Sequence, residues 1–105
     1  MSDVIIKPGG AWQKDPQSKR FVVFDWGDRY LTVGVDILTS VWAITGPDAS
    51  LTKDNETVLV GNRQTRARLI GGTAGSSYTV SNKITTNESP DQIDERSFEV
   101  RVREL

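Results

Sequence analysis

Carboxylate side chains offer the most direct route to chemistry in this sequence. Asp25, Asp28 and Asp36 lie close together along the chain, and paired carboxylates can serve as general acid and base. Turns and strand ends explain the same residues as well, because Asp is a common turn residue. The chain has no histidine and no cysteine, which removes the usual general base and the commonest metal ligands. We therefore expect no enzyme, no catalytic residue, no cofactor and no metal.

Two polar loops resemble ion-binding loops only in part. Asp54, Asn55 and Glu56 lack the alternating oxygen spacing and the distal glutamate of a calcium loop, and we expect a hydrophilic turn over residues 53–56. Gly71, Gly72 and Gly75 could cradle a phosphate, but that needs a following helix start and usually a lysine. Here a predicted strand follows instead. We interpret these glycines as a turn in which glycine supplies positive φ.

Composition restricts the class of protein and its partners. With 105 residues the chain is expected to form one domain. A formal net charge of −1 gives no electrostatic footprint for nucleic acid or an anionic membrane. No apolar run approaches the length of a membrane span, and the first residues do not show a charged-then-apolar leader pattern, so we expect neither a span nor a secretory signal. We expect neither nucleic acid nor a membrane as a partner.

Period-two alternation is the main secondary-structure signal. In the stretch that begins at Tyr78, one face carries Tyr78, Val80, Asn82 and Ile84, which is typical of a strand with one buried face. Short strands of this kind recur at intervals of about 8–12 residues, with Gly, Pro, Asn and Asp between them. The pattern predicts an all-β fold, a single immunoglobulin-like antiparallel β-sandwich over residues 14–105.

Several residues are expected to be structural. Tyr78 follows the Gly-rich corner, as does the tyrosine of a tyrosine corner, whose hydroxyl bonds backbone upstream of the turn. Trp42 shares a face with Leu38, Ser40 and Ile44 and is our candidate for the central core indole. Asn82 faces inward, where an unpartnered amide is costly. We expect it to bridge the sheets or bond a loop backbone, with a ligand contact as the alternative.

Two sets of residues are candidates for partner binding. In residues 1–13, the apolar side chains of Ile6 and Trp12 flank Pro8-Gly9-Gly10. This segment is either an edge strand or a flexible arm that docks onto a neighbour, and we favour the arm. Arg66 and Arg68 alternate with apolar residues, so they form a solvated strand face first and a contact surface second.

Beyond these patterns, the sequence resembles a known family. The residues that carry the resemblance are Leu69-x-Gly-Gly-Thr-Ala-Gly-x-x-Tyr78-x-Val-x-Asn82-x-Ile84-Thr-Thr, then Asp94-Glu-Arg-Ser-Phe-x-Val-x-Val102. It is similar to small bacteriophage structural proteins of the fibre–tail connection type. The Lys14-Asp-Pro16 and Asp25-Trp26 segments match as well, as does Trp42 with the preceding Thr39-Ser40. The hairpin at 87–93 departs from the family, because it is longer and lacks a glycine turn.

The resemblance implies a non-enzymatic virion protein with an immunoglobulin-like fold. Its partners would be other tail, baseplate or fibre proteins, in a copy number set by virion symmetry. Its location would be the phage tail after synthesis in the host cytoplasm. A neck or head–tail adaptor is one alternative. A host-surface carbohydrate- or receptor-binding module is another, and Trp12, Trp26 and Tyr30 are the aromatic side chains that it would use.

Overall fold

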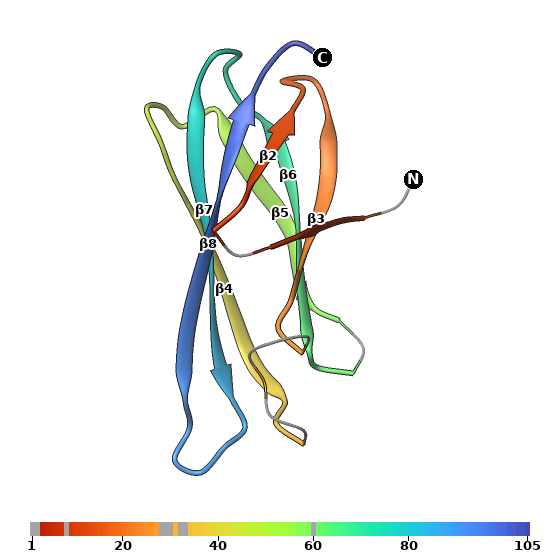
Figure 1. Cartoon of the computed structure of the whole chain (residues 1–105), viewed down its shortest axis with the longest axis vertical. Helices are drawn as coiled ribbons and strands as arrows, with labels where there is room; N and C mark the ends of the chain where they lie inside the picture. The colour runs from red at the N-terminus through yellow and green to blue at the C-terminus, as the bar shows by residue number, and fades with distance from the viewer. Residues whose placement is uncertain (1–2, 8, 28–30, 32–33, 60) are drawn as a thin grey trace.

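The chain folds into a β-sandwich of two four-stranded sheets (Figure 1). The computed structural model describes residues 3–7, 9–27, 31, 34–59 and 61–105. Its strands are β1 (Val4–Ile6), β2 (Ala11–Lys14), β3 (Lys19–Asp25), β4 (Ile37–Thr45), β5 (Leu51–Val58), β6 (Gln64–Gly71), β7 (Ser77–Thr86) and β8 (Ile93–Val102). One sheet has the order β1-β3-β6-β5 and the other has the order β2-β8-β7-β4. The predicted all-β sandwich is confirmed. In the described residues, no helix is apolar and long enough to cross a bilayer.

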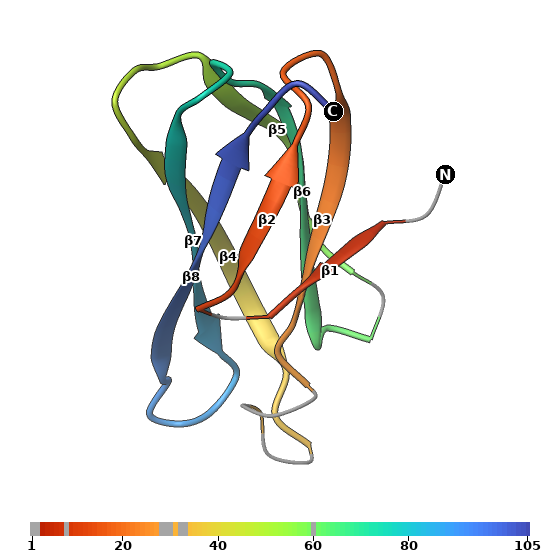
Figure 2. The ribbon, with the colours of Figure 1, turned by 45° about the horizontal axis from the view of Figure 1, so that its top comes forward.

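The strands are not all antiparallel, which corrects the sequence-based prediction. The pairs among β3 to β8 are antiparallel, whereas β1 pairs with β3 in parallel and β2 pairs with β8 in parallel. The N-terminal segment causes this, because it contributes one short strand to each sheet (Figure 2). Gly9 has a φ of +77° at the crossing, and its N–H donates to Ser97 O at 2.8 Å. The expected boundary between arm and domain, at residues 13 and 14, falls inside β2.

The core fills the space between the inner faces of the sheets. Aromatic side chains meet at its centre: the Phe24 ring centroid lies 5.8 Å from those of Trp26 and Trp42 and 5.5 Å from that of Phe98. Aliphatic side chains from β3, β6, β7 and β8 surround them, namely Val22, Leu69, Val80, Ile84, Val100 and Val102. Trp42 is buried, as predicted from its alternation within β4.

Two bulges shift the faces that simple alternation predicts. In β4 the register shifts between Ile37 and Thr39. As a result Ile37 is buried, and Leu38, which was expected to share the face of Trp42, is 62% exposed. In β5 the register shifts between Asp54 and Thr57, and Asn55 has a φ of +51°. The expected turn at 53–56 is therefore a bulge within one continuous strand, since a bulge tolerates an unpaired residue without ending the ladder.

Candidate partner-binding surfaces

Asn82 joins the two sheets through its side-chain amide. Its Oδ1 accepts from Thr65 Oγ1 of β6 at 2.6 Å and from Trp26 Nε1, just after β3, at 2.8 Å. Its Nδ2 donates to Ser40 Oγ of β4 at 2.8 Å. Asn82 is fully buried, so these partners offset the cost of burying an amide. The hydrogen bonds use both polar atoms of the amide and bridge the two sheets.

The Tyr78 hydroxyl ties together two loops at one end of the sandwich. It accepts from Thr73 N at 3.0 Å, five residues upstream, which is the geometry of a tyrosine corner. It donates to Asp48 Oδ1 at 2.8 Å. The same carboxylate accepts from Ser50 Oγ at 2.6 Å, from Ser50 N at 3.0 Å and from Thr73 Oγ1 at 2.9 Å. These hydrogen bonds hold the pKa of the Asp48 carboxyl well below its usual range, and those from Ser50 contribute most.

The glycine corner at the same end has a geometry that only glycine fits well. Gly71 and Gly72 have φ values of +82° and +101°. A Cβ on Gly71 would lie 2.6 Å from Ser50 O, and one on Gly72 would lie 2.6 Å from Val102 Cγ2. Gly75 also has positive φ, but a Cβ there would meet open space. The corner leads into β7, and no helix N-terminus is present to cradle a phosphate.

Lys14 is a buried residue whose importance the sequence reasoning missed. Its Nζ donates to Ser18 O at 2.6 Å, to Gly71 O at 2.8 Å and to Asp15 O at 2.9 Å. Burial lowers the pKa of this ammonium, and the neighbouring Asp15 carboxylate opposes that shift. Lys14 thus ties the turn after β2 to the glycine corner. The sequence signal that could have pointed to it was the Lys14-Asp-Pro16 motif, which contains both this lysine and Asp15, one of its three acceptors.

The N-terminal residues pack on the sandwich, contrary to the expectation of a free arm. Ile6 is 7% exposed and belongs to the core, so its side chain is not available to a partner. Trp12 is partly buried against the core, opposite Val100. Ile5, in contrast, is 66% exposed. The physical reason is register: residues 4–6 pair with β3, which directs Ile6 to the face of Phe24 and Ile5 to the opposite face. A shallow hollow of about 290 Å³, which we call the N-terminal hollow, is lined by Val4–Lys7 and Gly10–Trp12 of β1, β2 and the segment between them.

Arg66 and Arg68 project from the outer face of β6, among residues of the neighbouring strands. The Arg66 guanidinium lies 4.4 Å from the Phe21 ring centroid, and its Nη1 lies 3.4 Å from Asp3 Oδ2. Arg68 forms a bidentate pair with Asp54 at 2.6 and 2.8 Å, which raises the pKa of Arg68 and lowers that of Asp54. We call Phe21, Asp54, Arg66 and Arg68 the arginine face. It combines an aromatic ring with cations that are only partly exposed.

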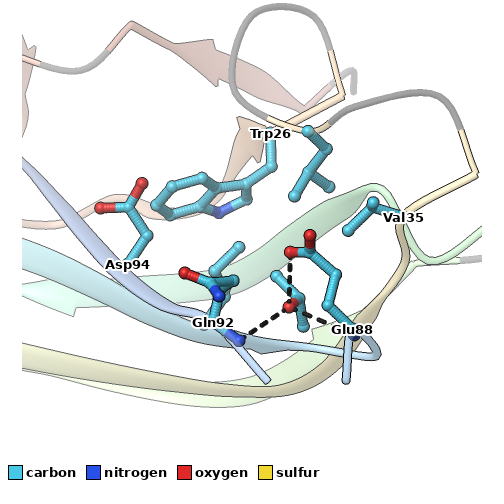
Figure 3. A pocket seen from close by; sticks show the side chains of 8 residues that line it. Trp26, Val35, Glu88, Gln92 and Asp94 are labelled. Carbon is cyan, nitrogen blue, oxygen red and sulfur yellow. Dashed lines mark hydrogen bonds between the residues drawn. The ribbon is translucent and has the colours of Figure 1, made fainter. Parts of the chain in front are cut away.

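A second hollow, of about 200 Å³, lies beside the hairpin that joins β7 to β8 (Figure 3). Trp26, Val35, Glu88, Gln92 and Asp94 lie around it. Much of its polar rim is bonded internally, because Thr86 Oγ1 accepts from Gln92 N at 3.1 Å and donates to Glu88 Oε1 at 3.0 Å. Asp94 is paired with Arg96. The rim therefore offers few free polar groups for a small ligand.

The candidate carboxylates and surface aromatics are not gathered into one site. Asp25 ends β3, whereas Asp36 precedes β4. The Asp36 N–H donates to Asn87 Oδ1 at 3.0 Å, and the Asn87 N–H donates to Asp36 O at 2.9 Å. Asp28 and Tyr30 lie outside the described residues. Trp26 is buried in the core, so it is not a surface aromatic for a glycan. Among the described residues, no group of three Asp, Glu, His or Cys side chains could hold a metal ion.

A comparison with protein families identifies the group to which this sandwich belongs. A family model described as "Podophage GP4 fiber-tail adaptor protein gp77" matches residues 14–101, most of the chain. The chain belongs to this adaptor family. The match begins at Lys14 and includes both the glycine corner and Tyr78, so the resemblance predicted from the sequence is confirmed. The description names an adaptor between fibre and tail in a podophage.

A solved structure shows the same fold in a different protein. The crystal structure of the cysteine protease inhibitor EhICP2 from Entamoeba histolytica aligns with a TM-score of 0.58 over 95% of this chain and 94% of that one. The identity is 9%, so this likeness concerns the fold alone. No curated protein matches the sequence.

Proposed function

We propose that this protein is a non-enzymatic virion component that connects tail fibres to the phage tail or baseplate. Its membership of the fibre–tail adaptor family carries the proposal. The described structure supports the proposal in two ways. The buried polar side chains of Asn82 and Tyr78 form hydrogen bonds within the sandwich, and the candidate carboxylates Asp25 and Asp36 lie on separate elements. The protein would act in several copies, with neighbouring tail, baseplate or fibre proteins as its partners.

The arginine face is the contact surface that we propose for one of these partners. Protein interfaces are enriched in arginine and aromatic side chains, which supply a broad apolar plane together with directed hydrogen-bond donors. The Arg66 guanidinium over Phe21 presents both. The Arg68–Asp54 pair holds its own charges in place beside them, so the face is partly ordered before a partner arrives and loses less side-chain entropy on binding.

The N-terminal hollow extends this proposed contact surface around the edge of the sandwich. Exposed Ile5 lies opposite Val23 of β3, which in turn lies opposite Arg66. Trp12 lines the same hollow from β2. An apolar side chain of a fibre or tail protein that seats here would contribute roughly 1.5–3 kcal/mol. Trp12, Arg66 and Arg68 therefore remain proposed partner-binding residues, whereas the buried Ile6 does not.

The test is incorporation into phage particles. Arg66→Ser should lower the free energy of unfolding of the purified protein by no more than about 1–2 kcal/mol, since it removes a surface ion pair with Asp3 and a partly exposed contact with the Phe21 ring. In particles that contain only this variant and no wild-type protein, the amount of fibre protein bound per tail should fall markedly, as measured by quantitative mass spectrometry.

A matched control lies on the other sheet. Arg101 of β8 is also a strand arginine with an acidic partner, Glu99, and it is exposed on the face away from the core. Arg101→Ser removes the same charge and should give normal particles. Equal fibre content in both variants would reject the arginine face as the contact surface. Particles that assemble fibres normally without this protein would reject the adaptor function itself.

A further inference from the structure

The two long edges of the sandwich are protected very differently. An unpaired strand edge can accept another strand, and proteins usually block such edges with charges, bulges, proline or short length. β5 carries Lys53, Asp54 and Glu56 and is interrupted by its bulge. The edges formed by β1 and β2 are only three and four residues long. Each of these edges therefore has a recognisable protection.

β4 is the exception among the edge strands. It is nine residues long, Ile-Leu-Thr-Ser-Val-Trp-Ala-Ile-Thr, with no charged residue and no proline. It pairs with β7 on one side, and in the part of the chain that the structure describes no strand pairs with its other side. Leu38 and Val41 are 62% and 60% exposed on it. Its bulge lies at the first residues, so the stretch Thr39–Thr45 stays in continuous register with β7.

We propose that β4 pairs antiparallel with β4 of a second copy of this chain, which would merge two four-stranded sheets into one of eight strands. The charges on the two long edges favour β4 of the second copy, rather than its β5, as the partner strand. A β4 strand meets no like charge in a self-pair, whereas pairing with β5 of another copy would place Lys53, Asp54 and Glu56 beside its uncharged residues.

Symmetry favours the same occupant. A two-fold pair uses the unprotected edge of both copies in a single contact, and the merged sheet then ends at the short β2 strands. A head-to-tail contact would instead leave one unprotected edge free and continue into a filament. The pair would also be compatible with the proposed adaptor, because β1 and β2, which line the N-terminal hollow, lie at the opposite edges of their sheets.

The face pattern of β4 suggests the register. Val41 pairs with Lys83 and Thr39 with Thr85 on the outer face of the sheet, whereas buried Trp42 pairs with buried Asn82 on the inner face. Antiparallel partners must match outer with outer. A two-fold axis at Val41 does so, since it sets Val41 opposite Val41 and Thr39 opposite Ala43.

Single-cysteine variants test the pair directly, because the chain has no cysteine of its own. Directly opposite residues in an antiparallel pair have Cα atoms about 4.5 or 5.5 Å apart, within the range that a disulfide spans. Val41→Cys should therefore form a disulfide-linked dimer under mild oxidation. Gln13→Cys, an exposed position in β2 at the other edge of the same sheet, should not.

Mass measurements across a concentration series give an independent readout. The wild-type protein should approach twice the chain mass of 11.6 kDa. Val41→Lys should weaken self-association about tenfold or more, because two like charges would lie opposite each other, whereas Gln13→Lys should dimerise normally. A wild-type protein that stays monomeric would overturn the proposal, and so would dimers insensitive to Val41→Lys or linked through position 13. None of these measurements needs another virion protein, so such a failure would leave the adaptor function standing.

Discussion

At the scale of single residues, a few buried polar side chains hold the sandwich together. Asn82 accepts from Trp26 and Thr65 on the side of one sheet and donates to Ser40 in the other. An apolar residue of similar size could fill the same space. It could not accept from the two donors, and a buried group that loses its partner costs about 1–3 kcal/mol.

Asn82→Ala should therefore destabilise the protein by about 3 kcal/mol, since the acceptor shared by two buried donors is lost and a cavity is left. Urea unfolding followed by tryptophan fluorescence would measure this. Ser81→Ala, the neighbouring position on the outer face, should change the free energy of unfolding by less than about 0.5 kcal/mol. Equal midpoints for the two variants would contradict the bridging role.

Asp48 makes the free energy of unfolding depend on pH in the acidic range. Its folded pKa lies below the ordinary value of 3.8, so at low pH the unfolded chain binds more protons than the native one. The stability contributed by Asp48 is thus present above about pH 4 and is lost as pH falls below it. The difference in stability between wild type and Asp48→Asn should shrink over that range in urea titrations.

Tyr78→Phe provides the matching comparison, because it keeps the carboxylate and removes one of its donors. It should cost about 1 kcal/mol at neutral pH and retain a weaker acid dependence than wild type. If Asp48→Asn and wild type lost stability in parallel on acidification, the hydrogen bonds to this carboxylate would not be the cause.

At the scale of elements, the glycine corner decides how β6 passes into β7. Gly72 and Gly75 both have positive φ, but only Gly72 lies against another side chain, that of Val102 in β8. The two positions therefore separate backbone strain from steric overlap.

Gly75→Ala should cost about 1–2 kcal/mol through strain alone. Gly72→Ala should cost roughly 1–3 kcal/mol more, because its methyl group would overlap the core. Thermal unfolding of the two variants would measure the difference. If Gly75→Ala were the more destabilising of the two, the packing of the corner against β8 would be assigned wrongly.

At the scale of the whole molecule, the N-terminal segment is part of the sandwich and also borders the proposed contact surface. Ile5 and Ile6 are adjacent and chemically identical, yet one faces solvent and the other the core. Ile6→Ala should cost about 2–5 kcal/mol, and Ile5→Ala should stay within about 0.5 kcal/mol.

Chemical denaturation would compare these two variants. Deleting β1 altogether should also destabilise the fold, because it removes a paired strand and a core side chain. An Ile6→Ala variant as stable as Ile5→Ala would restore the hypothesis of a detached arm.

Local pattern alone was enough to predict much of this molecule. Alternation assigned the buried faces of β7 and β8 correctly, because side chains on a pleated strand alternate strictly. The family could also be identified from the sequence, since the resemblance rested on a local series that contains the glycine corner, Tyr78 and Asn82. Tertiary structure decided the rest: the insertion of β1 and β2 into opposite sheets, the exposure of Leu38 at a bulge and the acceptors of Lys14. These features depend on contacts between residues far apart in the chain, and no local periodicity encodes such contacts.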